Sequence, residues 1–188
     1  MNLFYLDEDL DKCAEYHVDK HIVKMPLEAA QLLCTAIWID AKLGFVPRAL
    51  DKDEREVLNS EKAKIKHLPL DQRPLTPYLP MMYNHPCTIW ARESSSNYMW
   101  LYEHFLALGE EYKYRYGREH ASIIKLAKPL LCIPDNIKTG AMTPPAQAMP
   151  EEYKDEDATV AYRNYCINEK HYAKWERNRT KPTWWTTQ

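Results

Sequence analysis

A long run of apolar residues at helical spacing near the N-terminus constrains the fold of this chain more than any other feature. The run follows the acidic segment around Asp7 and Asp9 and continues to Ile39, with apolar positions every three or four residues. Either aspartate can cap the helix, because a carboxylate there accepts hydrogen bonds from free backbone N–H groups. We predict a kink or a break at Pro26, since proline lacks an N–H group and crowds the preceding turn. The core face of this helix carries Val18, Ile22, Met25, Ala29, Leu32 and Leu33.

The rest of the sequence adds further helices and little strand signal. Ser94 to Asn97 offers caps for a long helix over 97–116, and Gly117 suits the left-handed residue that ends it. Its apolar ridge is Leu101, Phe105, Leu108 and Tyr112. We also predict helices over 51–66 and 157–175 and a proline-rich loop over 129–150. These elements predict an all-α or mostly α fold: a single compact helical domain (residues 1–188) with a short extended N-terminal segment, a peripheral polar insertion at 43–80 and an aromatic, basic tail at 176–188.

Two histidines, a lysine and a glutamate share the polar face of the first long helix. At ~100° per residue, His17, His21, Lys24 and Glu28 fall within one stripe. The stripe mixes groups that titrate near neutral pH with a cation and an anion, which is the combination that proton-transfer chemistry uses. A solvated surface face, or buried histidines bonded to their neighbours, explains the same pattern equally well. A break at Pro26 would rotate Glu28 away from the two histidines.

The same stripe supports two kinds of active site. His17 and His21, one helical turn apart, can chelate a metal ion whose site Glu28 or Glu93 completes, although Lys24 on the same stripe would repel a divalent ion. The competing use is free of metal. A lysine, or the α-amino group of Met1, attacks a carbonyl-like carbon, and a nearby carboxylate stabilises the cation that forms. For any single lysine, a solvated charge is the ordinary alternative.

Candidate ligand-binding residues lie in two further places. Arg92, Ser94 and Asn97 precede the central helix, where an arginine and hydroxyl groups can hold a phosphate or carboxylate. A helix cap with a surface arginine is an equal alternative. His85 lies in the Asn84-His85-Pro86 turn just before them. The C-terminal part interleaves aromatic and basic side chains, which is typical of surfaces that stack nucleic-acid bases, although tyrosines packed between helices are the competing explanation. That set is Tyr162, Arg163, Lys170, Trp184 and Trp185.

Composition excludes several classes of protein. The net charge of −2 gives no global sign of nucleic-acid binding, although residues 160–188 carry six basic against two acidic side chains. The five cysteines are widely spaced and never in a Cys-x-x-Cys pair, which favours reduced thiols in the cytoplasm over a disulfide or zinc framework. No signal peptide is visible, and the uncharged apolar stretch 29–39 is far short of the ~20 residues that span a bilayer. The motifs of nucleotide hydrolysis and hydride transfer are absent.

Six short motifs are spread over most of the chain and together resemble a family of small bacteriophage proteins. They are Asp19-Lys20-His21-x-Val23-Lys24-Met25-x-Leu27-Glu28, Asn84-His85-Pro86, Trp90-x-Arg92-x-Ser94-x-x-Asn97-Tyr98-x-Trp100-Leu101, Thr143-Pro144-Pro145, Ala148-Met149-Pro150 and Ala161-Tyr162-Arg163-x-Tyr165.

Other short elements resemble, more distantly, the phage pyrimidine-dimer DNA glycosylases of the endonuclease V type, which are small, all-α and free of metal. The shared elements are the short apolar N-terminus, His17 nine residues before Pro26, the Asn84-His85-Pro86 turn, a long helix ending near Tyr116-Gly117, and the basic aromatic end Thr180-Lys181-Pro182-Thr183-Trp184-Trp185.

This second resemblance implies an enzyme that excises bases through an amine nucleophile and a glutamate. The glycosylases attack with the α-amine of a small residue exposed when Met is removed, whereas Asn2 here would leave Met1 in place. Their glutamate lies two residues before the proline, where this chain has Lys24, while Glu28 lies two residues after it. The arginines that flank their glutamate are also absent. The resemblance therefore leaves Lys24 or the Met1 amino group as the nucleophile.

The leading hypothesis is a DNA glycosylase/AP lyase, or a related phage enzyme that modifies DNA bases, working in the cytoplasm of the host cell without a cofactor or a membrane. Lys24 or the Met1 amine would attack, Glu28 would act as acid and base, and His17 and His21 would move protons. The remaining residues would hold DNA phosphates or an everted base: His85, Arg92, Ser94, Asn97, Tyr162, Arg163, Lys170, Trp184 and Trp185. The alternatives are a metal-dependent hydrolase or oxygenase ligated by His17, His21 and Glu28, and a non-enzymatic phage protein that binds a host factor.

Overall fold

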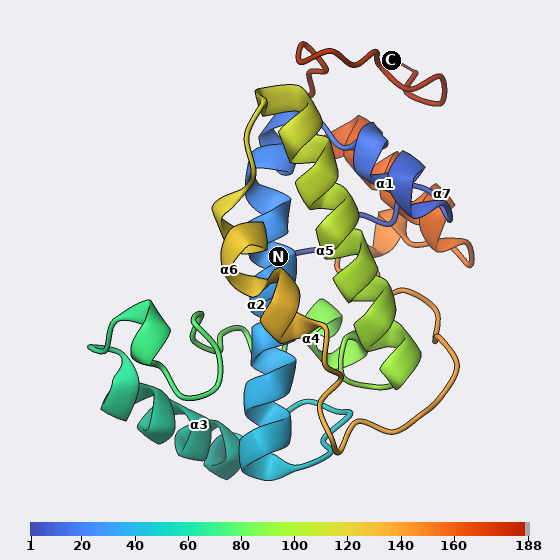
Figure 1. Cartoon of the computed structure of the whole chain (residues 1–188). Helices are drawn as coiled ribbons and strands as arrows, with labels where there is room; N and C mark the ends of the chain where they lie inside the picture. The colour runs from blue at the N-terminus through green and yellow to red at the C-terminus, as the bar shows by residue number, and fades with distance from the viewer. Residues whose placement is uncertain (187–188) are drawn as a thin grey trace.

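Helix α2 (Asp19–Leu43) is the axis of the fold in the computed structural model, which describes residues 1–186. Helix α5 (Ser95–Tyr116) packs along it, α1 (Leu10–Tyr16) packs against α5, and α6 (Ala121–Leu130) packs against both α2 and α5 (Figure 1). The smaller elements are α3 (Lys52–Ile65), α4 (Pro86–Trp90), α7 (Ala158–Glu169) and the 3-10 turns Leu70–Gln72 and Glu151–Tyr153. Residues 1–186 contain no β-strand, so the prediction of an all-α fold is confirmed.

The predicted break at Pro26 is wrong, because α2 runs through this proline without interruption. Proline in a helix interior costs about 3 kcal/mol, but Pro26 is buried, and Met25 before it and Ala29 after it are packed in the core. The chain breaks earlier instead, at His17 and Val18, whose ψ angles of 139° and 154° are extended. This moves His17 off the helix that carries Glu28 and keeps Glu28 in register with Lys24.

The N-terminal segment is an extended arm buried in the fold. Leu3, Phe4 and Leu6 are each less than 10% exposed, and they join the main core together with the apolar faces of α2 and α5. Phe4 adopts φ of +47°, a left-handed conformation that costs energy for a bulky residue. The surrounding packing therefore holds this arm in a shape that the sequence alone disfavours.

Local signals predicted some helices well and others poorly. The cap at Ser94 and the left-handed Gly117 bound α5 as expected, although the helix begins at Ser95 rather than at 97. Asp9 caps α1, and α3 lies within the predicted 51–66 range. Helix α6 was not predicted, and α7 ends at Glu169, six residues before the predicted Trp175. The final residues of the predicted tail, 187–188, lie outside the described residues.

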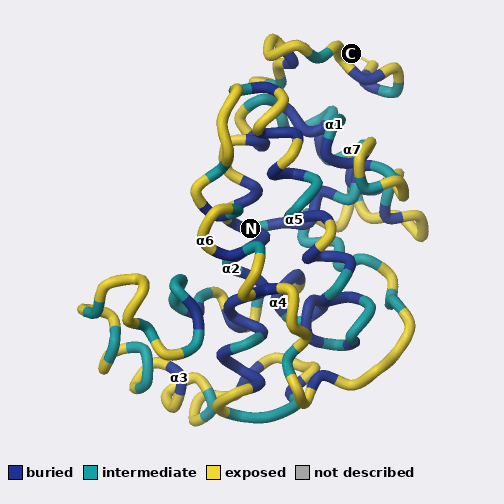
Figure 2. The backbone as a smooth tube through the Cα atoms, viewed as in Figure 1, coloured by how far each residue is buried: buried dark blue, intermediate teal, exposed yellow. Residues whose placement is uncertain are grey.

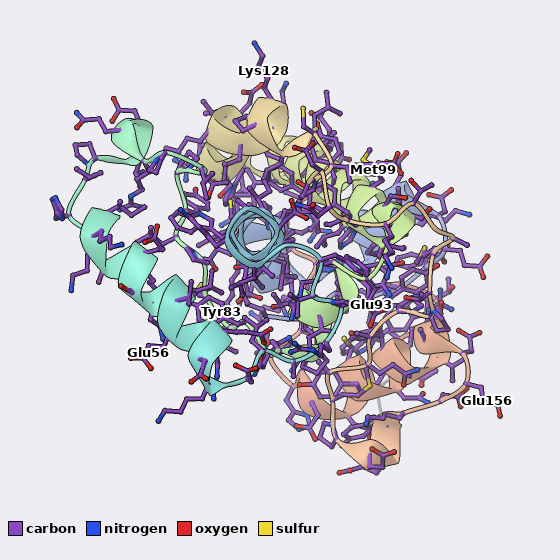
Figure 3. All side chains as sticks on the ribbon, turned by 90° about the horizontal axis from the view of Figure 1, so that it is seen from below. Glu56, Tyr83, Glu93, Met99, Lys128 and Glu156 are labelled. Carbon is purple, nitrogen blue, oxygen red and sulfur yellow. The ribbon has the colours of Figure 1, made fainter. Side chains whose placement is uncertain are left out.

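A second, smaller core joins α3 to the end of α2. It consists of Ile39, Val46, Leu50, Leu58 and Tyr83. Leu58 is the buried residue of α3, and the rest of that helix is largely exposed (Figure 2). Viewed nearly along α2, α3 lies on one side with Glu56 pointing outward, and α7 lies on another (Figure 3).

Helix α2 is long and apolar enough to cross a membrane by length and composition alone. Within the fold, 72% of its most apolar window is buried by protein, as is usual for the central helix of a bundle.

Candidate functional site

A hollow of about 390 Å³ opens between the N-terminal arm, the first turns of α2 and the segment that follows α7. Charged and aromatic side chains from these distant parts of the chain meet there. Its lining consists of Met1, Asn2, Phe4, Lys20, His21, Lys24, Met25, Glu28, Ala148, Tyr165, Lys170 and Tyr172.

The Glu28 carboxylate pairs with two ammonium groups in this hollow. Lys24 Nζ lies 2.7 Å from Glu28 Oε1, and the Met1 amino nitrogen lies 3.7 Å from Oε2. Glu28 is 7% exposed and the Met1 side chain is also buried, whereas the Lys24 side chain is 66% exposed. The hydrogen bond from Lys24 to Glu28 raises the pKa of Lys24. The hollow therefore brings the chain's α-amino group and an exposed lysine amine to the same buried carboxylate.

His21 lies in the wall of the hollow, one helical turn before Lys24. Its Nε2 is 3.2 Å from the Tyr172 hydroxyl oxygen, and its ring packs on Phe4 with centroids 4.3 Å apart. Burial lowers the pKa of His21 far below the ordinary value of 6.5, with nearby His17 and Lys170 adding to the effect. At neutral pH the ring is uncharged, so it can offer hydrogen bonds but holds no proton to release as an acid.

His17 lies in the core and does not line the hollow. It is fully buried, its Nδ1 is 2.7 Å from the Cys13 carbonyl oxygen, and its Nε2 has no hydrogen-bond partner. Burial lowers its pKa to about 4. The predicted stripe is therefore divided: Lys24, Glu28 and His21 meet in the hollow, while His17 faces inward.

Sequence reasoning missed His104, which packs beside His17 with ring centroids 5.5 Å apart. It is 1% exposed, stacks on Trp100, and neither of its ring nitrogens has a hydrogen-bond partner. Burial lowers its pKa well below 6.5. His104 lies three residues after Leu101 on the apolar ridge of α5, and this spacing could have predicted from the sequence that it is buried. Asn2 and Tyr172 were also missed, and no local pattern marks either as part of a site.

The geometry does not fit a metal site at His17, His21 and Glu28. His17 uses Nδ1 inside the core, and Glu28 is already paired with two ammonium groups. Among residues 1–186 no group of three His, Cys, Asp or Glu side chains is arranged to hold a metal ion. The metal alternative fails here because α1 and α2 are separate helices, so the two histidines do not project from one face.

His85 caps α4 and lies close to the amine and carboxylate of the hollow. Its Nδ1 accepts a hydrogen bond from the Cys87 amide. Burial and then the positive Met1 amino group lower the pKa of His85, while Glu28 acts in the opposite sense. His85 does not line the hollow, so it can act on the Met1 amino group and Glu28 only through electrostatic interaction.

Arg92, Ser94 and Asn97 form a structural hub rather than an anion cradle. Arg92 is 2% exposed and donates hydrogen bonds to the carbonyl oxygens of Val46, Tyr83 and Arg48. Ser94 caps α5 through the Asn97 amide. The Asn97 side chain donates to the Trp90 carbonyl and the Thr143 hydroxyl and accepts from the Thr143 amide. Because these donors and acceptors are already used, we correct the prediction that this cluster binds substrate.

Most of the predicted C-terminal contact residues also serve the fold. Tyr162 is fully buried and donates to Asn2 and Ala146, which corrects its predicted role on a DNA surface. Arg163 binds the Leu6 carbonyl and Asp7, and its guanidinium lies over the Trp184 ring. Trp185 is 8% exposed and packs edge-on against Trp175. Trp184 is partly buried, and its Nε1 lacks a hydrogen-bond partner.

Lys170 alone of that set reaches the hollow, and a basic rim continues from it. Lys170 Nζ is 3.0 Å from the Tyr165 hydroxyl, and Lys20 Nζ lies over the Tyr172 ring. Two further hollows, of about 520 and 340 Å³, adjoin the first and share lining residues with it. We define the basic rim as Lys20, Lys170, Lys174 and Arg177, which line one or more of the three hollows.

An ion-pair network fastens the segment that carries this rim. Arg115 binds Asp19 and Glu111, and Arg179 binds Glu111 and Glu15. The Asp19 carboxylate also accepts the Glu176 amide. Arg115 and Glu111 are buried, so these contacts hold the segment after α7 against the start of α2.

No protein-family model, curated protein or solved structure matches this chain. The resemblances to phage proteins therefore remain predictions.

Proposed function

We propose that this chain is a DNA-acting enzyme of the glycosylase type, or a related enzyme that modifies DNA bases, with an amino group of the Glu28 hollow as its nucleophile. The observation that supports this most is the Met1 amino group 3.7 Å from the buried Glu28 carboxylate in an open hollow. Imine chemistry needs this pair, because the amine attacks while the carboxylate takes up and returns a proton.

Met1 is the better nucleophile of the two amines. The pKa of Lys24 is raised by its bond to Glu28, so the lysine stays protonated near neutral pH. The Met1 amino nitrogen is 3.7 Å from Glu28, whereas Lys24 Nζ is 2.7 Å from it, so the carboxylate holds the α-amino group less tightly than the lysine.

In the proposed reaction the Met1 ammonium gives a proton to Glu28, and the neutral nitrogen attacks C1′ of the target nucleotide. The C1′–N bond to the base breaks, its electron pair leaves with the base, and the base takes the proton from Glu28. The sugar ring then opens, O4′ takes a proton from the nitrogen, and an iminium joins Met1 to C1′ until water hydrolyses it. Uncharged His21 can bond to the sugar or base in the same hollow.

The basic rim favours DNA over a small neutral substrate. Lys20, Lys170, Lys174 and Arg177 lie around the hollow, whereas the chain as a whole carries a net charge of −2. Clustered cations attract the phosphates of a strand by releasing its counterions. Tyr172 is 42% exposed beside the mouth and offers a ring on which a base can stack.

Borohydride trapping tests the proposal directly. The untagged protein is incubated with duplexes that carry ultraviolet photoproducts, hypermodified bases or an abasic site, and borohydride reduces any imine. We expect a covalent adduct that peptide mass mapping assigns to Met1. Glu28→Gln should lower the trapping rate by about 100-fold, the usual contribution of an acid–base group.

Glu61→Gln is the matched control. Glu61 is also a carboxylate paired with two lysines, Lys42 and Lys64, but it lies on α3 away from the hollow. Its substitution should leave trapping unchanged. Absence of an adduct on every duplex, or equal loss with both variants, would overturn the proposed function.

A further inference from the structure

The second residue of the chain, Asn2, is a buried polar side chain whose amide is used at both ends. It is 8% exposed, and its Nδ2 donates to the Ala148 carbonyl oxygen at 2.9 Å. Its Oδ1 accepts from the Leu3 amide at 2.9 Å and from the Tyr162 hydroxyl, with Cys87 Sγ at 3.7 Å. Disrupting the hydrogen bonds of a buried side-chain amide costs free energy, so these bonds hold the neighbouring segments in place.

The partners of Asn2 come from separate parts of the fold. Tyr162 belongs to α7, Cys87 to α4, and Ala148 to the proline-rich loop. Tyr162 also donates to the Ala146 carbonyl, so the loop and α7 are tied to each other at the same point. Asn2 is therefore the junction where three distant segments hold the start of the chain.

This junction lies one residue from the amine that contacts Glu28. Consecutive Cα atoms are about 3.8 Å apart, so fixing residue 2 leaves residue 1 only a small range of positions. The strained φ of +47° at Phe4 shows that the arm is held on its other side as well. A nucleophile held in place in this way loses little freedom when it reacts.

We infer that Asn2 is a positioning residue that holds the Met1 amino group against Glu28. The inference deepens the proposed function, on which its catalytic meaning rests, but the contact between Met1 and Glu28 can be measured without any DNA substrate. Asn2 does not touch the reacting atoms. It acts through the backbone of residue 1.

The test is a double-mutant cycle read by chemical labelling of Met1. Formaldehyde with cyanoborohydride methylates free amines, and peptide mass mapping gives the rate at Met1 and at exposed lysines such as Lys128. In the native chain, Glu28→Gln should speed Met1 labelling about threefold or more, because the carboxylate that pairs with this amine is gone. In the Asn2→Leu chain, which retains Met1, Glu28→Gln should then have no effect on that rate.

A residue that serves only the fold would not alter this coupling. If Glu28→Gln speeds Met1 labelling equally in both backgrounds, the inference is overturned. Asn2→Asp is the second variant should Asn2→Leu fail to fold, since it keeps the Oδ1 acceptor and replaces the donor to Ala148 with a carboxylate oxygen; because this adds a charge, the effect of Glu28→Gln is compared within the Asn2→Asp background. Lys128 labelling and far-ultraviolet circular dichroism report whether the fold persists. Coupling without trapping on any duplex would sink the proposed function and leave the positioning role of Asn2 intact.

Discussion

The hub around Arg92 and the hollow around Glu28 use similar side chains in opposite ways. In the hub, Arg92 and Asn97 have given their hydrogen bonds to backbone carbonyls and to Thr143, and both are buried. In the hollow, Glu28, Met1 and Lys170 are held in position but face an open space. Polar side chains can bind a ligand or take part in chemistry only where the fold leaves their hydrogen-bonding groups accessible. The residue type alone does not show whether this is so.

The largest effect is expected at the hub. Arg92→Met removes the donors to three carbonyl oxygens and leaves buried acceptors without partners. It should lower the free energy of unfolding by about 4 kcal/mol, measured by urea denaturation. Arg55→Met on exposed α3 is the control and should change it by less than about 0.5 kcal/mol. If Arg92→Met retains full stability but loses DNA binding, Arg92 is a binding residue, and the assignment of the hub to the fold alone is wrong.

Acid should destabilise the fold through its buried histidines. The pKa of His17 falls from 6.5 to about 4 on folding because the charged ring cannot be solvated in the core. Below pH 6.5 the unfolded chain therefore binds more protons, and stability falls as the pH drops from 6.5 toward 4. His17 alone should contribute a loss of about 3 kcal/mol over that window.

Denaturation between pH 7 and 5 measures this slope before most carboxylates titrate. His17→Gln should make this slope shallower, with His21 and His104 carrying the rest, whereas His67→Gln, at an exposed position, should leave it unchanged. An equal slope in all three proteins would show that the inner histidines are not buried in the neutral form.

Helix boundaries could be predicted from the sequence where a local capping residue marks them. The candidate site could be predicted only for those of its residues that lie on one helix. Ser94 and Gly117 bound α5 through their own side chain and conformation, so sequence reasoning found them. Lys24 and Glu28, one turn apart on α2, were found for the same reason. The prediction of a break at Pro26 was wrong, because a local rule for proline carries no information on the packing that keeps α2 continuous.

Long-range contacts account for most of what sequence reasoning missed. Asn2 meets Tyr162 and Ala148 across about four fifths of the chain, and His21 meets Tyr172 in the same way. Arg92 resembles a phosphate ligand in sequence, and only the carbonyls of Val46 and Tyr83 reveal its structural use. Spacing along one helix cannot predict such contacts.

Moderate effects are expected on the basic rim. Lys170→Gln should weaken DNA binding and reduce the slope of log affinity against log salt by about one, if Lys170 neutralises a phosphate. Fluorescence anisotropy over a salt series measures both quantities. Lys128→Gln on α6, which points away from the α7 side in Figure 3, should change neither. Identical slopes for both variants would place DNA elsewhere on the surface.

The smallest effect is expected at Lys24. Its ion pair with Glu28 is largely exposed on the lysine side, so Lys24→Gln should change the free energy of unfolding by less than about 1 kcal/mol. Borohydride trapping should persist, because the Met1 amine remains. Loss of trapping with an unchanged fold would instead identify Lys24 as the nucleophile.

The small core beneath α3 has a consequence for how the molecule opens. Leu58 is the residue by which α3 is anchored, against Ile39, Val46, Leu50 and Tyr83, while α2 and α5 share a far larger interface. Local fluctuations cost least where few apolar contacts are lost. Amide hydrogens of α3 should thus exchange with solvent water well before those of α2 and α5. A protease should cleave first within α3, while the helices at the opposite end of the bundle stay folded.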